Sequence, residues 1–331
     1  MPELDVSIIV VSFNTRDLTR ACLQSISDHC QALNYEVIVV DNASADGSSE
    51  MVTREFPEIR LLANSENLGF ARANNQAFEI ATGRFLLLLN PDAEVRENTV
   101  QACLEFAETR PDAGAIGCRA HSETGEQQST LFRHLRPHFV LINTFLPNRL
   151  TVKSKLFGRA RYVGLDLDQV QEVEVVAGCF MLVRREVLEQ VGGMDGEFFM
   201  YAEESEWCFR MRQAGFKNLY FPGAAILHYG GRSAEQSIPQ MTENLCRGQL
   251  LFIQKTQGRG AAWISNLLML CRDLPRLVPW TLAGLLGRKR REQIRTLLAP
   301  SMLRLPLLLR GLWYPDWGLR GRDASGTARG D

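Results

Sequence analysis

The sequence lacks both glycine-rich signatures that commonly mark nucleotide-binding loops. No G-x-G-x-x-G follows the first predicted strand, and G-x-x-x-x-G-K-[ST] occurs nowhere in the 331 residues. Such loops bring backbone N–H groups against phosphates in Rossmann and P-loop proteins. Their absence argues against a dehydrogenase and against a P-loop NTPase.

Paired cysteines, a signal peptide and long apolar runs are also missing. The eight cysteines show no C-x-x-C pair and no zinc spacing, and most lie in apolar segments, which indicates free buried thiols in a reducing compartment. No basic leader with a cleavage site precedes the first strand, and no stretch reaches the roughly 20 apolar residues of a membrane span. A cytoplasmic protein is therefore expected. The net charge of −1 does not indicate a nucleic-acid partner, and none is expected.

Strand and helix patterns alternate along the first hundred residues. Apolar, β-branched runs bounded by turn residues predict strands, and apolar residues at helical spacing predict helices. Helical connections require parallel neighbouring strands, so the sequence predicts a doubly wound α/β sheet. The predicted order is strand 6–12, helix 17–27, strand 36–41, a helix after 48, strand 60–63, helix 67–81 and strand 85–89.

The apolar run Phe85–Leu89 predicts a central strand that delivers a carboxylate to the ligand edge of the sheet. Pro91 ends the strand and Asp92 follows it. Open α/β sheets bind ligands outside the carboxyl ends of their strands. Ser12 and Asp41 end two other predicted strands and should face the same crevice. Asp41 either binds a base or ribose or caps the turn that follows it.

Four motifs in order resemble glycosyltransferase family 2, and more closely its bacterial rhamnosyltransferase-like branch with the GT-A fold. The resemblance covers roughly residues 5 to 250. The motifs are Val6 to Asn14, the segment 37–48 (VIVVDNASADGS), the segment 67–75 (NLGFARANN) and the segment 88–92 (LLNPD).

The resemblance implies that a dTDP-, UDP- or GDP-sugar binds along these strand ends. Asn90 stands where the family usually has the first acid of Asp-x-Asp, so Asp92 is the one anionic ligand of this motif. One carboxylate, two diphosphate oxygens and water suit Mg²⁺ or Mn²⁺. The implied donor-binding residues are Ser12, Asn14 and Asp41 at the base, Asn67, Gly69 and Asn75 at the ribose and diphosphate, and Arg72 at a phosphate.

The second half of the predicted catalytic domain is less regular. A helix is predicted over 94–110 and a strand over 115–118. Residues 119–172 combine basic, aromatic and proline residues with poor periodicity, which fits either a surface loop or a lid over the acceptor. The long strand 173–183 is interrupted by Gly178, which indicates a bend or a close approach of the acceptor.

The segment Phe198–Met211 carries the candidate catalytic acids. In a helix from about Ala202, Glu204 shares the apolar face, whereas Glu203 and Glu206 lie on the side of Arg210. Burial raises the pKa of a carboxyl toward that of a general base. The family has Glu-Asp here, which implies a base at Glu204, with Glu203 beside it. The alternative is that Glu204 is an acid in the first turn that stabilises the helix through its interaction with the helix dipole.

Two further side chains are candidates near this helix. Trp207 is a candidate acceptor platform, although a core position is favoured for it. His228 ends the apolar stretch 224–228, shortly before Gly230 and Gly231, where GT-A enzymes often place a metal-binding His. Neutral imidazole could bind a cation opposite Asp92; a hydrogen-bonded structural His is the alternative.

After about residue 243, leucine- and tryptophan-rich stretches alternate with basic clusters, and acids are nearly absent from 288 to 322. Basic amphipathic helices with interfacial tryptophans fit an anionic membrane surface. Packing on the catalytic domain or on a second subunit is the alternative. The expected organisation is a catalytic domain over 1–242 (a nucleotide half 1–118, an acceptor half 119–242), a basic amphipathic helical region over 243–322, and a disordered tail over 323–331.

Together these features predict an inverting, metal-assisted glycosyltransferase with a Glu base. By resemblance its donor carries rhamnose or another deoxyhexose, and its acceptor is a glycan or lipid-linked hydroxyl in cell-surface polysaccharide synthesis. We expect it to be cytoplasmic and peripheral on the inner face of the cell membrane. Two alternatives remain: a membrane-surface scaffold with a retired active site, and a sugar nucleotidyltransferase, whose basic glycine-rich loop is missing after the first strand.

Overall fold

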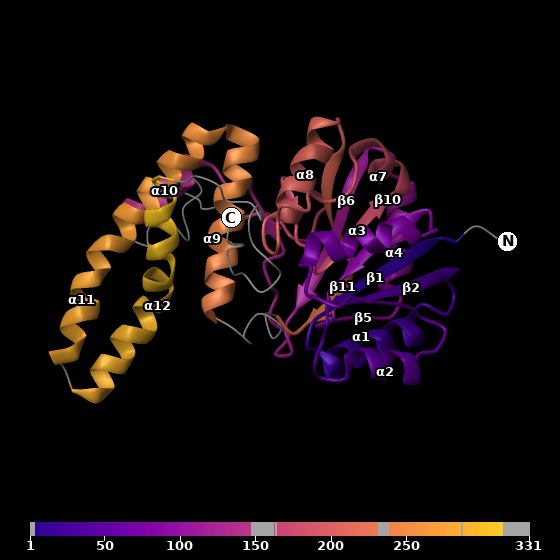
Figure 1. Ribbon diagram of the computed structural model, residues 1–331. Coiled ribbons are helices and arrows are strands. Elements are labelled where there is room, and N and C mark those ends of the chain that lie inside the picture. Colours follow the sequence, from indigo (N-terminus) through magenta and orange to yellow (C-terminus); the bar gives the residue numbers. More distant parts are fainter. Residues whose placement is uncertain (1–3, 147–161, 163, 231–237, 286, 314–331) are drawn as a thin grey trace.

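The computed structural model describes residues 4–146, 162, 164–230, 238–285 and 287–313 (Figure 1). Its centre is a nine-stranded sheet in the order β3-β2-β1-β4-β10-β6-β11-β5, with β8 also paired to β11. The strands are β1 (Val6–Ser12), β2 (Tyr35–Asp41), β3 (Arg60–Ala63), β4 (Phe85–Leu89), β5 (Ala93–Val95), β6 (Ala113–His121), β7 (Leu131–Phe132), β8 (Gln171–Val173), β9 (Val175–Val176), β10 (Phe180–Arg184) and β11 (Lys217–His228).

Helices cover the sheet, and a further set follows it toward the C-terminus (Figure 1). Around the sheet lie α1 (Arg16–His29), α2 (Ser48–Glu55), α3 (Phe70–Ile80), α4 (Thr99–Glu108), α7 (Arg185–Val191) and α8 (Glu203–Gln213), whereas α5 (Pro137–Phe145) packs on α10 (Arg259–Asp273). The later set is α9 (Ile238–Gln257), α10 (Arg259–Asp273), η2 (Leu274–Arg276), α11 (Leu277–Leu282), η3 (Ala283–Leu285) and α12 (Arg288–Arg310).

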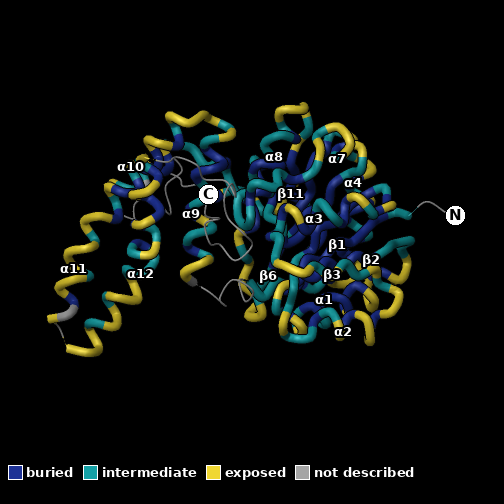
Figure 2. The backbone as a smooth tube through the Cα atoms, in the orientation of Figure 1, coloured by how far each residue is buried: buried dark blue, intermediate teal, exposed yellow. Residues whose placement is uncertain are grey.

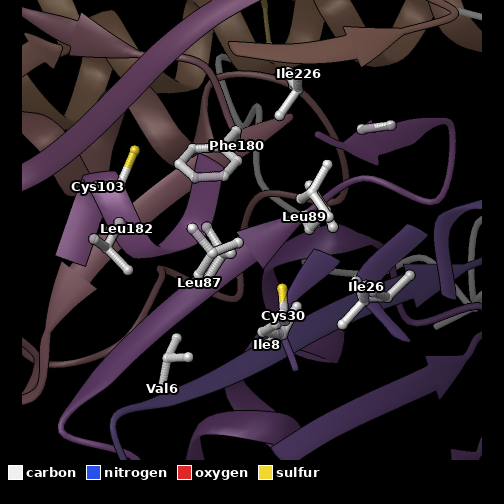
Figure 3. Packing of buried hydrophobic residues seen from close by; sticks show 14 of the residues in the cluster. Val6, Ile8, Ile26, Cys30, Leu87, Leu89, Cys103, Phe180, Leu182 and Ile226 are labelled. Atoms are coloured by element: carbon white, nitrogen blue, oxygen red, sulfur yellow. The ribbon is translucent and has the colours of Figure 1, made fainter. Parts of the chain in front are cut away.

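The nucleotide half forms the parallel sheet that the sequence predicts. β1 lies between β2 and β4, so that Ile9 is paired with Ile38 on one side and Leu88 on the other. Because side chains alternate across each strand, one all-apolar run supplies two cores. One core includes Ile8, Leu87 and Leu182 (Figure 3), and the opposite face is covered by α3, α7 and α8.

The second half differs from the prediction in three places. The predicted strand 173–183 is divided into β8, β9 and β10, and Gly178 lies before β10. β10 runs antiparallel to both of its neighbours, β4 and β6. The predicted helix 94–110 begins only at Thr99, because residues 93–95 pair with β11 as β5. β11 is one strand with register shifts between Lys217 and Leu219 and between Phe221 and Ala225, the second of which spans Pro222. The sheet remains mostly parallel.

Helix α9 joins the sheet to the later helices. It lies between α8 and the pair α10 and α12, as Figure 1 shows. A third core of aliphatic and aromatic side chains lies among α9, α10 and α12, and α5 contributes Val140 to it. The hydroxyl of Thr144 on α5 donates to the carbonyl of Leu268 on α10 at 3.2 Å. A segment from the predicted acceptor half thus packs with the C-terminal helices.

Buried charge also holds the C-terminal helices together. Asp273 has no exposed surface and contacts Arg272 at 3.1 Å, Arg276 at 2.9 Å and Arg304 of α12 at 3.0 Å. Across the described residues, no helix is both long and apolar enough to span a membrane. All eight cysteines are free, and only Cys271 is exposed. The predicted disordered tail 323–331 and Trp317 lie outside the described residues.

Candidate active site

A cavity of about 340 Å³ opens at the carboxyl ends of β1, β2 and β4. The loop before α8 and the first turns of α9 close its other side. Its walls combine aromatic rings with side-chain amides, a mixture suited to a ligand with a flat base and many hydroxyls. The described residues that line it are Val11, Phe13, Asn42, Asn67, Gly69, Phe70, Asn90, Pro91, Asp92, Phe199, Met200, Tyr201, His228, Gln240, Met241 and Asn244.

Asp92 lies at the cavity wall with only 3% of its surface exposed. Its backbone carbonyl accepts a hydrogen bond from the N–H of Tyr229 at 2.9 Å, which holds the turn after β4 against the end of β11. Its Oδ1 atom has no hydrogen-bond partner among the described residues. A buried carboxylate oxygen without a partner is costly, so this atom is available to a ligand.

His228 brings a second unpartnered atom to the same point. Its Nε2 lies 3.4 Å from Oδ1 of Asp92, and within the described part of the chain it too has no hydrogen-bond partner. Gln128 orients the ring: its Nε2 donates to the His228 carbonyl at 2.8 Å, and its Oε1 lies 2.6 Å from Nδ1. Nδ1 therefore carries a proton toward Gln128, and Nε2 is the ring nitrogen that faces Asp92.

A divalent cation fits between these two atoms. A carboxylate oxygen and an imidazole nitrogen that face each other are a common ligand pair, and the hydrogen bond to Nδ1 is the outer contact that orients a metal-binding histidine. Within the described residues, no three His, Cys, Asp or Glu side chains are placed so that they could hold one metal ion. The protein would thus supply two ligands, and the remaining positions are open to a substrate or water.

Gly69 allows α3 to approach the opposite wall. Its φ of 81° lies in the left-handed region, and a Cβ atom there would lie 2.2 Å from the carbonyl oxygen of Phe199. The N–H of Phe70 donates to that same oxygen at 2.8 Å. Asn67 accepts a hydrogen bond from the N–H of Gly69 at 2.9 Å. Only glycine fits this contact, which joins the loop before α3 to the loop before α8.

The turn that enters α8 is strained. Tyr201 and Ala202 have φ values of 71° and 73°, two consecutive non-glycine residues in the left-handed region. Such residues cost free energy and persist when their surroundings hold them. Helix α9 does so: a Cβ atom on Gly248 would lie 2.2 Å from the carbonyl oxygen of Tyr201. The turn therefore depends on close packing by the C-terminal helices.

The two acids that begin α8 both have raised pKa values. Burial raises the pKa of Glu203 well above its usual value, and the neighbouring Glu204 raises it further. Its Oε2 has no partner among the described residues. Burial also raises the pKa of Glu204, against smaller opposing hydrogen bonds from the backbone. Glu204 is the more exposed of the two, so it is better placed to exchange a proton with a ligand.

The predicted helix faces of α8 need correction. Glu203 and Glu206 were expected on a solvated side with Arg210, but both are buried, and Glu204 is only partly so. The reason is that α8 packs against the sheet on one side and against α7 and α9 on others. Arg210 binds Glu206 at 2.7 Å and also donates to the carbonyl oxygens of Val191 and Gly193.

The charges of Asp92 and Glu204 both act on the buried thiol of Cys179. After burial, which dominates, both carboxylates raise the pKa of the buried Cys179 thiol, to about 12. Neither Glu204 nor Glu203 is among the described residues that line the cavity, although Met200 and Tyr201, separated from them by Ala202, are. Both acids directly follow the strained turn in sequence, at the start of α8.

Ser12 and Asn14, which the sequence predicted at the base, are held in internal hydrogen bonds. The hydroxyl of Ser12 is fully buried and lies 3.1 Å from those of Thr15 and Thr19. Asn14 accepts a hydrogen bond from the N–H of Ala45 at 2.7 Å. Neither of them is among the described residues that line the cavity.

Asp41 follows the alternative prediction, a cap for the turn after β2. Its carboxylate is 2% exposed and accepts hydrogen bonds from the N–H and hydroxyl of Ser44 at 3.1 and 2.5 Å and from the hydroxyl of Ser49 at 2.8 Å. Its acceptor positions are directed into this turn. The next residue, Asn42, lines the cavity instead.

Arg72 and Asn75 also have structural contacts. Asn75 donates to the carbonyl oxygen of Met194 at 2.7 Å and accepts from its N–H at 2.9 Å. Arg72 donates to the carbonyl oxygen of Gly196 at 2.8 Å. These contacts fix the segment before Phe198, and neither residue is among the described residues that line the cavity. Their roles at the ribose, diphosphate or phosphate stay predictions.

Trp207 is a core residue and not an acceptor platform. It has no exposed surface, stacks on Phe78 at 5.4 Å between ring centroids, and donates to the carbonyl oxygen of Gly192 at 2.8 Å. Gly178 lies beside the ring of Phe70, which lines the cavity. The acceptor role of Gly178 remains a prediction.

Several lining residues were missed. Gln240, Met241 and Asn244 lie on α9, which the sequence assigned partly to a separate helical region. Their spacing of three and four residues would have placed them on one helix face, but nothing in the sequence directs that face toward β4. Gln128 lies in an irregular segment, so its contact with His228 had no sequence signal.

Comparison with known proteins agrees with this architecture. A family model described as glycosyl transferase family 2 matches residues 7–192. An N-acetylglucosaminyl-diphospho-decaprenol L-rhamnosyltransferase of Mycobacterium tuberculosis is 27% identical over 83% of this chain and 88% of its own length. Rhamnosyltransferase WbbL of Escherichia coli K12 is 25% identical over 68% of this chain and 83% of its own.

Among solved structures, mannosyltransferase PcManGT from Pyrobaculum calidifontis, in complex with GDP-Man and Mn²⁺, shares the fold. The alignment covers 95% of this chain and 88% of that one, with a TM-score of 0.54 and 17% identity. Because the family model covers more than half of the sequence, the chain belongs to glycosyltransferase family 2 and is a GT-A-fold glycosyltransferase.

Proposed function

We propose that the protein transfers rhamnose or another deoxyhexose from a dTDP-, UDP- or GDP-sugar to a hydroxyl of a lipid-linked glycan, at the inner membrane face, during cell-surface polysaccharide synthesis. The observation that carries the proposal is the pair of buried, unpartnered atoms at the cavity wall, Oδ1 of Asp92 and Nε2 of His228, 3.4 Å apart. The donor sugar and lipid acceptor are inferred from the names of the M. tuberculosis and E. coli relatives.

Asp92 and His228 would hold Mg²⁺ or Mn²⁺ together with the donor diphosphate. PcManGT, with the same fold, is described with GDP-Man and Mn²⁺. When bound, a divalent cation supplies Lewis-acid stabilisation of the charge on the departing nucleoside diphosphate. Two protein ligands suit this role, because Mg²⁺ and Mn²⁺ keep waters and substrate oxygens in their remaining positions.

Glu204 would act as the general base. It accepts the proton of the acceptor hydroxyl while that oxygen forms a bond to the anomeric carbon of the donor. The bond from that carbon to the diphosphate oxygen breaks with its electron pair, so one displacement inverts the anomeric centre. The raised pKa of Glu204 favours this role, because a base is most effective with a pKa near the working pH.

A panel of nucleotide sugars incubated with the full chain and Mn²⁺ or Mg²⁺, scored for released nucleoside diphosphate, tests the proposal. We expect metal-dependent release, reduced about 10²- to 10⁴-fold in Glu204→Gln, the range typical of general-base loss. Asp92→Asn should lose most of the metal dependence. Asp28→Asn, an exposed acid on α1, is the matched control.

Two outcomes would overturn this mechanism. One is full activity in both Asp92→Asn and Glu204→Gln. The other is a protein that a nucleoside diphosphate stabilises against heat but that releases none from any sugar, which would favour a retired binding protein.

A further inference from the structure

An exposed apolar stripe runs along the outer side of the C-terminal helices. Helices α10, η2, α11 and η3 follow one another, and the junction residues Leu274, Leu277 and Ala283 keep right-handed helical dihedrals. Along this path, large apolar side chains recur at separations of three, four or seven residues, the spacing of one helix face. This outer stripe consists of Ile264, Leu267, Leu274, Val278, Leu282 and Leu285, all exposed.

The exposure of the outer stripe is unusual for a water-facing helix. Val278 is 59% exposed and Leu285 is 84% exposed, and the stripe spans about 21 residues, or roughly 30 Å at 1.5 Å per residue. The other sides of α10 pack on α5, α9 and α12. Figure 2 shows the exposed colour continuing along α11, which lies far from the sheet. Contiguous apolar surface of this length marks an interaction site.

A basic segment follows the outer stripe along the chain. Helix α12 packs along α10 and α11, and the guanidinium carbon of Arg295 lies 5.8 Å from the ring centroid of Trp280 on α11. Between Leu274 and Trp313 the sequence has eight basic residues and one acid, Glu292, which pairs with Arg288 at 3.2 Å. The run Arg288–Arg291 opens α12 next to the tip of the stripe.

We propose that the outer stripe and the basic segment together bind an anionic lipid surface, with the stripe immersed at the headgroup boundary. This deepens the proposed function by naming the surface that would bring the cavity to a lipid-linked acceptor. Amphipathic helices with a basic border bind anionic bilayers in this way. A two-fold dimer on the same surface would bring the two basic segments together, which opposes that arrangement.

Helix α9 connects this surface to the active site. Its first turns carry Gln240 and Asn244 at the cavity, and its later turns pack in the core shared with α10 and α12. A bilayer held by the outer stripe therefore has a fixed relation to the cavity mouth.

Flotation of the full chain with vesicles, without any nucleotide sugar, tests the inference. We expect binding to vesicles of phosphatidylglycerol and phosphatidylcholine, weaker binding at high salt, and little to phosphatidylcholine alone. Ile264→Gln/Val278→Gln/Leu282→Gln should abolish flotation. Lys289→Gln/Arg290→Gln should weaken it roughly thirty-fold, because each basic residue near such a surface contributes about fivefold.

Matched variants separate the surface from general effects. Val278→Gln should reduce flotation, whereas Val170→Gln, at another exposed valine, should not. Arg16→Gln/Arg54→Gln on the catalytic half is the control for charge. Equal binding by the stripe variant and the wild type would overturn the inference, as would a wild type that is dimeric in solution and becomes monomeric in the stripe variant while vesicle binding is unchanged.

The two proposals can fail separately. Release of nucleoside diphosphate is measured without vesicles and flotation without donor. If the protein binds anionic vesicles but releases no nucleoside diphosphate from any donor, only the proposed function is contradicted. If it releases nucleoside diphosphate but does not bind anionic vesicles, only the proposed lipid-binding surface is contradicted.

Discussion

Acid should destabilise this protein through one buried imidazole, that of His134. The ring lies between α8 and α9, stacked on Phe252 and edge-on to Phe209, at 5.6 and 5.4 Å between centroids. Neither ring nitrogen has a hydrogen-bond partner among the described residues. Burial lowers the pKa of His134 from 6.5 to about 4, against a smaller opposing effect of Glu174.

The size of the effect follows from linkage. Above pH 6.5 the imidazole is neutral in both the folded and unfolded states, so it adds no pH dependence. As the pH falls from 6.5 to about 4, the unfolded chain binds a proton that the folded chain excludes, and stability is lost. A difference of about 2.5 pKa units at roughly 1.36 kcal/mol each amounts to about 3 kcal/mol by pH 4.

The variant His134→Phe tests this value. Phenylalanine keeps the ring contacts and removes two unsatisfied nitrogens, so it should be neutral or stabilising at pH 7.5. Urea unfolding followed by tryptophan fluorescence, at pH 7.5, 6, 5 and 4, gives the free energy of unfolding of both proteins. We expect the advantage of the variant to grow by about 3 kcal/mol across this range.

The control is His29→Phe at an exposed position on α1, whose pH dependence should follow the wild type. Other groups titrate in the same range, but they are common to all three proteins and cancel in the differences. If the gap between His134→Phe and the wild type is the same at pH 7.5 and pH 4, the reasoning from burial is refuted.

Three further changes have defined outcomes. Gly248→Val should press a side chain onto the carbonyl oxygen of Tyr201, lower the melting temperature and reduce donor turnover, at a cost of about 1–3 kcal/mol; an unchanged melting temperature would contradict the close contact. Gln128→Leu should release the ring of His228 and raise the half-saturating Mn²⁺ concentration about 10- to 100-fold in a turnover titration, whereas unaltered metal affinity would mean that the ring needs no such support. Asp273→Asn should destabilise by about 3–5 kcal/mol in urea unfolding, because three arginines lose a buried acid; a loss below 1 kcal/mol would show that water replaces it.

The sequence predicted the strands that form the parallel half of the sheet because their signal is local. The run Phe85–Leu89 is apolar at every position, which requires burial on both faces, and it is paired on both sides in the structure. The proline after it made the end of β4 predictable, and with it the place of Asp92. The antiparallel insertion of β10 had no such signal, because direction depends on partners distant in sequence.

The site was harder to predict than the sheet. Both Asp92 and Asp41 follow or end a strand, but only Asp92 lines the cavity among the described residues. The carboxylate of Asp41 accepts hydrogen bonds from Ser44 and Ser49 in the turn that follows it. Asn75 has a side-chain amide that could bind a ribose or a phosphate, yet this amide binds the backbone of Met194, 119 residues away. For Glu203, helical periodicity failed because it assumes one covered face, and α8 is covered on several.

Because the single helix α9 joins the cavity to the later helices, the distance and angle between them depend on its length. Each residue advances a helix by about 1.5 Å and turns it by about 100°, so one inserted residue in the middle of α9 would swing Gln240 and Asn244 out of the cavity or rotate the attached helices by the same amount. α9 could be lengthened without turning these faces only by a number of residues close to a whole number of turns, such as seven or eleven. A seven-residue insertion would move the catalytic cleft about 10 Å farther from whatever the distal helices rest on.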